Sequence, residues 1–235
     1  MTRGLAESRT RAQALIMAGA VFSGERKLLK PGELLAEDAR LEVRGKDHPW
    51  VSRGGIKLDH GLTHFGFDVA GAVALDVGSS TGGFTDVLLT RGAAKVYAVD
   101  VGTNQFAWKL RQDPRVIVLE QTNARYLTAE QVPEPVDIVV CDASFIGLAK
   151  VLAAPLKLAK SGAKLVALVK PQFEAGREEV GKGGVVRDPA VHQRVCAEAS
   201  KWVETQGWSV LGVTQSPITG PEGNVEFLLG AEKND

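Results

Sequence analysis

The sequence predicts an α/β fold in which a large domain of alternating strands and helices follows a small α+β domain. Three observations carry this prediction. Strand-length apolar runs alternate with helical segments from residue 72 onward. A glycine-rich turn follows the first of these runs, where open α/β sheets bind ligands. The first 45 residues lack this alternation, and 235 residues suffice for one α/β domain and a small appendage.

The small domain is expected over residues 1–45, and a linker over residues 46–52. A helix is expected over residues 9–18, where apolar residues recur at helical spacing. Strands are expected at residues 20–23 and 40–43, the second because polar and apolar residues alternate there.

A net charge of zero conceals an uneven distribution of charge. Residues 1–30 carry six basic and two acidic side chains, so this stretch has a charge of +4 and the remainder −4. A basic lobe suits a nucleic-acid partner, although a run of charge is more often only a solvated face.

The sequence also indicates in which cellular compartment the protein is expected. No apolar run approaches the roughly 20 residues of a membrane-spanning helix, and the polar, Arg-rich start does not resemble a signal peptide. The two cysteines, Cys141 and Cys196, form no disulfide framework. We therefore expect a protein of the reducing cytoplasm.

The large domain is expected over residues 53–235 and begins with a helix. Strands are expected at residues 72–77, 95–100, 115–119, 136–141, 163–169, 208–214 and 224–230. Helices are expected near residues 55–65, 82–91, 105–111, 146–159 and 189–206. The turn-rich link between the last two strands is compatible with an antiparallel final strand.

The most informative stretch is Asp76-Val-Gly-Ser-Ser-Thr-Gly-Gly-Phe84, between the first strand and the next helix. Ser80 stands where a dinucleotide fingerprint needs glycine, and no lysine follows as a phosphate-binding P-loop would require. A plain tight turn would leave the fit of the later strands unexplained. The stretch resembles motif I of the S-adenosylmethionine-dependent methyltransferases, whose glycines admit the cofactor close to the backbone. The resemblance implies a Rossmann-like sheet of seven strands in the order 3-2-1-4-5-7-6, with cofactor contacts from Asp76, Gly78, Ser79, Ser80, Gly82, Gly83 and Phe84.

Two further residues are expected to hold the adenosine part of this cofactor. Asp100 closes the second strand, about 20 residues past the glycines, where a carboxylate accepts both ribose hydroxyls. The alternative role for Asp100 is to cap the following helix. Asn123 follows the third strand and is placed to meet the adenine edge.

Four polar residues lie at the ends of apolar elements, where burial is costly without a role. They are Lys57, Asp142, Lys170 and Glu226. A lone lysine is usually a surface residue, but this series resembles the tetrad of the FtsJ-type ribose 2′-O-methyltransferases. The resemblance implies that Lys170 accepts the hydroxyl proton. It also implies that Glu226 and Asp142 hold the two ammonium groups, with Asp142 touching the cofactor as well; no metal is required.

Other methyl acceptors fit the sequence less well. Enzymes that methylate exocyclic amines carry two prolines and an aromatic after the fourth strand, whereas this chain has Asp142-Ala-Ser-Phe145. Methylation of cytosine C5 needs a thiolate. Cys141 lies within an apolar strand and Cys196 within a helix, so both are expected to pack in the core.

Weaker signals remain open. His60 and His64 have helical i,i+4 spacing, but no third ligand accompanies them, so a solvated pair is favoured over a metal site. The basic, Gly-rich segment 181–188 is either a flexible connection or a loop that closes over RNA. Phe145 and Phe173 either stack on a splayed base or pack in the core.

Two resemblances extend the interpretation to the whole chain. Residues 3–45, with Ser8-Arg-Thr-Arg-Ala-Gln-Ala-Leu-Ile and Gly24, resemble the S4 RNA-binding domain, without the Arg-Leu-Asp-x-x-Leu helix that normally opens it. In S4 domains such helix arginines bind RNA phosphates. The whole chain resembles the TlyA family, also called hemolysin A. The resemblance rests on three motifs, Trp50-Val-Ser-Arg-Gly-Gly-x-Lys57, Lys170-Pro-Gln-Phe-Glu174 and Gly181-Lys-Gly-Gly-Val-Val-Arg-Asp188.

This resemblance implies ribose 2′-O-methylation of ribosomal RNA, notably at cytidine, with S-adenosylmethionine as cofactor and ribosomal RNA or ribosomal subunits as partner. The residues expected to bind RNA are Arg9, Arg11, Arg26, Lys27, Arg53, Lys182 and Arg187. Two alternatives remain open at this point. One is a membrane-damaging hemolysin, and the other is an RNA-binding module with an inactive methyltransferase domain.

Overall fold

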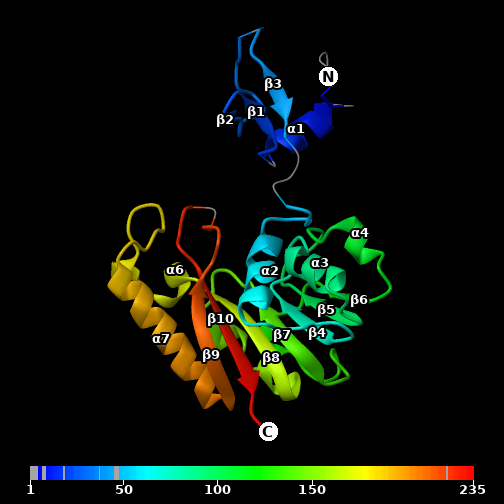
Figure 1. Ribbon diagram of the computed structural model, residues 1–235, viewed down its shortest axis with the longest axis vertical. Helices are drawn as coiled ribbons and strands as arrows, with labels where there is room; N and C mark the ends of the chain where they lie inside the picture. Colours follow the sequence, from blue (N-terminus) through cyan, green and yellow to red (C-terminus); the bar gives the residue numbers. More distant parts are fainter. Residues whose placement is uncertain (1–4, 7–8, 18, 37, 45–47, 221) are drawn as a thin grey trace. The chain divides into compact units, whose positions relative to one another are not determined.

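The computed structural model describes residues 5–6, 9–17, 19–36, 38–44, 48–220 and 222–235, without the side chains of Thr10, Arg11 and Ala14. The chain divides into two compact units, Met1–Pro49 and Trp50–Asp235 (Figure 1). The division falls inside the linker expected over residues 46–52, whose first two residues lie outside the described part. Each unit is described by itself below.

The small unit holds one helix and one sheet in its described residues. The helix α1 spans Arg9–Met17, close to the predicted 9–18. The sheet is antiparallel, with the strand order β2-β1-β3, and its strands are β1 (Val21–Ser23), β2 (Arg26–Lys27) and β3 (Leu41–Val43). The predicted strands correspond to β1 and β3, and the short β2 that completes the hairpin was not predicted.

The large unit is built on a seven-stranded sheet of order β6-β5-β4-β7-β8-β10-β9. Counted from β4, this order is 3-2-1-4-5-7-6, which confirms the prediction. Strand β10 runs antiparallel to both of its neighbours, and the other pairings are parallel. The strands are β4 (Val73–Val77), β5 (Lys95–Val99), β6 (Val116–Leu119), β7 (Val136–Cys141), β8 (Ala159–Val169), β9 (Trp208–Gln215) and β10 (Phe227–Lys233).

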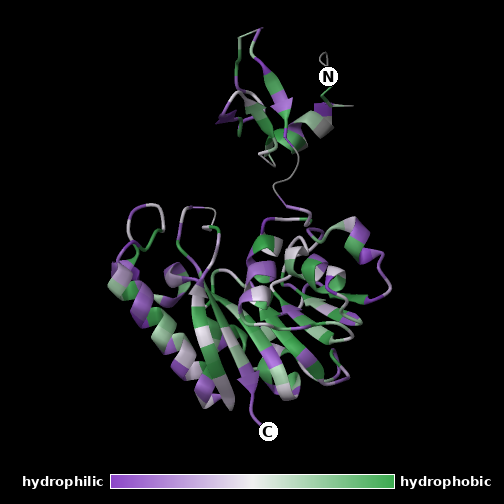
Figure 2. Ribbon diagram, viewed as in Figure 1, coloured by the Kyte–Doolittle hydropathy of each residue, from purple (hydrophilic) through white to green (hydrophobic). Residues whose placement is uncertain are grey.

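Helices cover both faces of this sheet, which is why its central strands are apolar on both sides. Side chains alternate across each strand, so Ala74 packs in one core with α2 and α3, while Leu75 packs in the other with α5 and α7. Figure 2 shows hydrophobic residues along these strands. The helices are α2 (Gly54–His64), α3 (Gly83–Thr90), α4 (Trp108–Arg111), α5 (Leu148–Val151), α6 (Pro171–Glu174) and α7 (Pro189–Thr205), with 3₁₀ turns η1 (Ala124–Tyr126), η2 (Pro155–Leu158) and η3 (Arg177–Glu179).

Several predicted elements of the large unit were wrong in extent: β8 begins four residues before the predicted 163, α4 begins three residues after the predicted 105, and two further differences bear on the site. The helix expected over 146–159 is instead the short α5 followed by η2, because Pro155 has no N–H to donate and its ring blocks a continuous helix. The last strand begins at Phe227 rather than at residue 224, so Glu226 precedes the strand instead of lying within it. None of the described helices is long and apolar enough to cross a membrane.

Candidate active site

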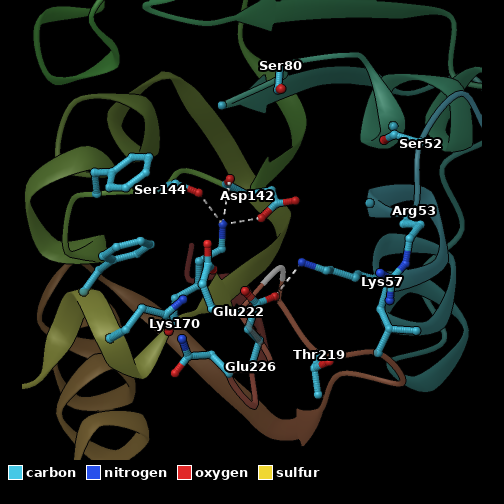
Figure 3. A pocket seen from close by; sticks show the side chains of 18 of the residues that line it. Ser52, Arg53, Lys57, Ser80, Asp142, Ser144, Lys170, Thr219, Glu222 and Glu226 are labelled. Carbon is cyan, nitrogen blue, oxygen red and sulfur yellow. Dashed lines mark hydrogen bonds and ion pairs between the residues drawn. The ribbon is translucent and has the colours of Figure 1, made fainter. Parts of the chain in front are cut away.

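A cleft of about 650 Å³ opens at the carboxyl ends of the parallel strands. Its walls come from the start of α2, the turn after β4, the segment after β7, α6, loop 181–187, and the segments 216–220 and 222–226. The volume lies within the range of small-molecule sites, roughly 300–1,000 Å³. Open α/β sheets bind ligands at this edge, and Figure 3 shows the side chains that meet there.

Lys57 on α2 reaches this cleft because two glycines permit close packing around the start of its helix. A Cβ on Gly55 would lie 2.3 Å from Cγ of the buried Trp50, so only glycine lets that ring sit on the helix. A Cβ on Gly83 would lie 2.3 Å from Ser52 Oγ, so α3 approaches the same segment closely.

Lys57 forms a buried ion pair with Glu226. The Lys57 Nζ donates to Glu226 Oε2 at 2.5 Å, and the two side chains are 9% and 1% exposed. Charges this far removed from water persist only when they are paired. The pair joins α2 to the segment that leads into β10.

Lys170 forms a second ion pair on the opposite wall. Its Nζ lies 2.6 Å from Asp142 Oδ1 and donates to the Asp142 carbonyl oxygen at 3.1 Å and to Ser144 Oγ at 2.8 Å. The contact with the Asp142 carboxylate is an ion pair whose angles do not meet the geometry of a hydrogen bond, and Oδ1 accepts no hydrogen bond in the described part of the chain. An ammonium has three donors, and three oxygens surround this one.

The four predicted tetrad residues therefore lie in one cleft as two lysine–carboxylate pairs. Figure 3 shows both ammonium groups directed toward its centre, Lys57 from one wall and Lys170 from the other. Ser144, the third oxygen at Lys170, was not predicted. Its only signal in the sequence is its position two residues after Asp142.

The predicted cofactor turn is tightly constrained. Gly78 has φ +81°, and a Cβ there would lie 2.9 Å from the backbone N and Cα of Ala143. Gly82 has φ +92° and a Cβ there would lie 2.5 Å from Leu110 Cδ1. Both positions exclude a side chain. The turn therefore presents bare backbone at Gly78, which packs against the backbone of Ala143.

Ser80 adopts the left-handed conformation at φ +46°, which is uncommon for a residue other than glycine. Its backbone N–H donates to Asp100 Oδ2 at 2.8 Å, and this bond fixes the strained turn. The other carboxylate oxygen of Asp100 accepts from the Gly102 N–H at 2.7 Å. Asp100 thus supports the turn, and each of its oxygens retains a second lone pair for a ligand.

Asp76 lies fully buried at the end of β4. Its Oδ2 accepts from Thr85 Oγ1 at 2.6 Å, and Oδ1 has no partner among the described residues. Burial raises the pKa of this carboxyl to about 7, and the nearby Asp142 and Asp100 add to the shift. An orphaned carboxylate oxygen under a glycine turn fits a ligand that carries a positive charge or N–H donors.

The cleft contains most of the predicted cofactor residues but not all of them. Gly78, Ser79, Ser80, Gly83 and Phe84 line it, as does Asp142. Asp76, Gly82, Asp100 and Asn123 do not line it. The Asn123 side chain accepts from the Arg125 N–H at 3.1 Å and caps η1, so its role toward a cofactor remains a prediction.

Of the residues predicted to bind RNA, three belong to the large unit and are exposed there. Arg53 lines the cleft at the start of α2, and Lys182 and Arg187 flank the tip of loop 181–187. Phe145 also lines the cleft, is 88% exposed, and forms a tilted ring pair with Phe173 at 5.1 Å between centroids. An exposed aromatic at φ +65° is not a core residue.

The predicted RNA-binding residues of the small unit are partly occupied by other contacts. Arg26 forms an ion pair with Glu33, and Lys27 lies 5.5 Å from the centroid of the Phe22 ring. Arg9 is exposed, and the Arg11 side chain lies outside the described part. Ion pairing of Arg26 lowers the charge that this unit offers to RNA.

Both cysteines are poor nucleophiles. Burial raises the pKa of the Cys141 thiol to about 12, and burial together with Glu174 raises that of Cys196 to about 11. His60 and His64 stack at 5.9 Å between ring centroids. No group of three potential metal ligands occurs within the described ranges of the chain.

The sequence and the fold are both similar to those of known proteins. Residues 50–233 match the family model of FtsJ-like methyltransferases. The chain is 50% identical to a Mycobacterium tuberculosis protein named 16S/23S rRNA (cytidine-2′-O)-methyltransferase TlyA, over 97% of this chain and 85% of that protein. It is 39% identical to Hemolysin A of Brachyspira hyodysenteriae, over 97% and 95%. A solved structure from Streptococcus thermophilus shares 44% identity and a TM-score of 0.81, over 100% of this chain and 86% of that one.

Proposed function

The chain belongs to the FtsJ-like methyltransferase family, and we propose that it methylates a ribose 2′-hydroxyl of ribosomal RNA at a cytidine. Family membership confirms the predicted resemblance and identifies S-adenosylmethionine as the methyl donor. The observation that carries the proposal is the two lysine–carboxylate contacts, Lys57 with Glu226 and Lys170 with Asp142, in one cleft beside the glycine turn.

The chemistry requires alignment and the removal of one proton. A ribose hydroxyl is a very weak acid and a poor nucleophile, and the bound cofactor supplies a methyl group activated by a sulfonium. We assign Lys170, in its neutral form, as the acceptor of the hydroxyl proton, and Asp142 and Ser144 as the groups that orient its amine. Lys57, held by Glu226, supplies a fixed positive charge from the opposite wall.

The residues of the cofactor side fit S-adenosylmethionine. Gly78 lines the cleft and is assigned to the amino-acid end, and the unpartnered Oδ1 of Asp76 is an acceptor close to that turn. We assign the ribose hydroxyls to the free lone pairs of Asp100 and the adenine edge to Asn123. Asp142 lines the cleft between the two sides and is assigned to both.

The RNA is assigned to the exposed basic residues at the cleft. Arg53, Lys182 and Arg187 would bind phosphates, and the exposed Phe145 ring would stack on a splayed base. We further propose that the small unit is an S4-like RNA-binding domain that acts through Arg9, Arg11, Arg26 and Lys27. We also propose a cytoplasmic location, because a ribosomal substrate is found there.

The test is methyl transfer from labelled S-adenosylmethionine to ribosomal RNA and to ribosomal subunits, followed by alkaline hydrolysis. A 2′-O-methyl group blocks cleavage of the adjacent phosphodiester, so label should survive in an alkali-resistant dinucleotide with cytidine at its 5′ position. Label in mononucleotides would show base methylation and refute the proposal. Dye release from lipid vesicles by the same preparation, without transfer to RNA, would favour the hemolysin alternative.

A further inference from the structure

Loop 181–187 projects beside the cleft, yet both of its ends are anchored on α7. At its carboxyl end, Asp188 caps α7 by accepting from the Ala190 N–H at 2.8 Å. At its amino end, Glu179 forms an ion pair with Arg194 of α7 at 2.5 Å. The loop therefore starts and ends at fixed points.

The tip of the loop is a tight turn of its own. Gly181 N–H donates to the Val185 carbonyl at 3.0 Å, and Gly184 N–H donates to the Gly181 carbonyl at 3.1 Å. Gly183 and Gly184 take φ +78° and +75°, as such a turn requires. Both glycines line the cleft. A turn closed by its own backbone has few conformations left to adopt.

Asn224, from the segment before β10, holds this loop in place. Its side chain is buried, with 1% of the residue exposed. Its Oδ1 accepts from the Val186 N–H at 3.0 Å, and its Nδ2 donates to the Gly184 carbonyl at 2.8 Å. His192 on α7 lies 2.9 Å from the Val186 carbonyl through Nε2, which donates when that nitrogen carries the proton.

The backbone around Asn224 also positions Glu226. The Asn224 carbonyl accepts from the Gly220 N–H at 2.9 Å, and the Glu226 carbonyl accepts from the Ser216 N–H at 2.9 Å. Gly220 packs against the Glu226 carboxylate so closely that a Cβ there would lie 2.6 Å from Oε1. Residues 216–220 and 222–226 thus form a folded unit that sets the carboxylate partner of Lys57.

We propose that Asn224 is a positioning residue that joins loop 181–187 to this unit, so that the basic loop and Glu226 form one rigid wall for the RNA substrate. The proposal rests on the proposed function, and it replaces the expectation of a flexible or closing loop by a preformed one. Because such a wall is ordered before the RNA binds, binding does not include the entropy cost of ordering the loop. Lys182 and Arg187 would then meet RNA phosphates at a set distance from the tetrad.

The first test compares Asn224→Ala with Ser216→Ala. Ser216 is buried and its hydroxyl donates to the Ile218 carbonyl at 2.7 Å, within the same unit and without a hydrogen bond to the described residues of loop 181–187. Hydrogen exchange, measured without RNA, should accelerate across residues 183–187 in Asn224→Ala and not in Ser216→Ala. Unchanged exchange in Asn224→Ala would overturn the proposed attachment.

Kinetics then separate positioning from mere stabilisation. In Asn224→Ala the KM for RNA should rise about tenfold, within the range expected for the loss of its two hydrogen bonds to the loop, with a smaller fall in kcat and unchanged affinity for S-adenosylmethionine. Ser216→Ala should lower Tm and leave the KM for RNA in place. If Asn224→Ala lowers Tm but leaves the KM for RNA unchanged, Asn224 has only a structural role and the proposal is overturned.

A second variant covers the case in which Asn224→Ala does not fold. His192→Ala removes the other contact to Val186 from outside the cleft, and it should raise both the exchange of the loop and the KM for RNA. An unchanged KM with a faster-exchanging loop would contradict the role of the wall. Absence of transfer by the unaltered enzyme would refute the proposed function itself, whereas the exchange data would still decide whether Asn224 holds the loop.

Discussion

The two sides of the cleft are built in different ways. The cofactor side is built around one continuous stretch, from Gly78 to Phe84, whose shape depends on backbone conformation and on positions that exclude a Cβ. The tetrad side takes single side chains from distant parts of the chain, and Lys57 and Glu226 stand 169 residues apart. Local sequence therefore determines the first side, while the sheet order determines the second. Substitutions on the two sides should therefore differ in their effects on stability and on cofactor binding.

The largest effect on stability is expected on the tetrad side, from Glu226→Gln. This change leaves the Lys57 ammonium buried without a counter-charge, which should lower the free energy of unfolding by about 3–5 kcal/mol. Urea denaturation measures it. Glu232→Gln is the control, because its ion pair with Lys164 lies at the surface and should contribute at most about 1 kcal/mol.

The double variant Glu226→Gln with Lys57→Met sharpens this result. Without the buried ammonium there is no charge left to compensate, so most of the lost stability should return while methyl transfer stays low. A double variant as unstable as Glu226→Gln alone would mean that the carboxylate stabilises the fold through contacts other than Lys57.

On the cofactor side, Asp76→Asn should change how stability depends on pH. The pKa of Asp76 is raised from an ordinary 3.8 to about 7 in the folded protein. The folded state therefore binds more protons than the unfolded state between these values, and stability falls as pH rises from about 4 to 7.

Asp76→Asn removes this loss, so its stability relative to the unaltered protein should increase across that interval, by at most about 4 kcal/mol. Chemical denaturation at pH 4.5 and pH 8 measures the difference. The exposed Asp68→Asn serves as control. A constant difference between Asp76→Asn and the unaltered protein at both pH values would show that Asp76 titrates normally.

A smaller loss of stability is expected from Gly78→Ala, compared with Gly162→Ala. Both glycines have positive φ, +81° and +70°, but a Cβ on Gly162 meets nothing within 4 Å. Strain should cost each variant about 1 kcal/mol, and the clash with Ala143 should cost Gly78→Ala about 1–2 kcal/mol more. Calorimetry should show weakened cofactor binding in Gly78→Ala alone. Equal cofactor binding by both variants would contradict the role assigned to the turn.

Much of this arrangement could be predicted from the sequence where local signals exist. The glycine turn and the apolar strands follow from composition and spacing, and the strand order followed from the resemblance that they supported. Pro155, which interrupts the predicted helix 146–159, is a local signal that the sequence itself contains.

The contacts that depend on tertiary packing could not be predicted. Ser144 meets Lys170 only because β7 and β8 are neighbours in the sheet. Asn224 binds Val186 only because two distant loops converge, and nothing near Asn224 in the chain indicates that contact. Such residues look like ordinary loop residues until the fold is known.

The most direct test of the division between the two sides is made on Lys170→Ala, with cofactor affinity and single-turnover methyl transfer measured on one preparation. The exposed Lys157→Ala is the control. The account predicts cofactor affinity close to that of the unaltered enzyme and a transfer rate lower by about a thousandfold, as expected for loss of a proton acceptor. Transfer at a near-normal rate, or a loss of rate explained entirely by weaker cofactor binding, would contradict it.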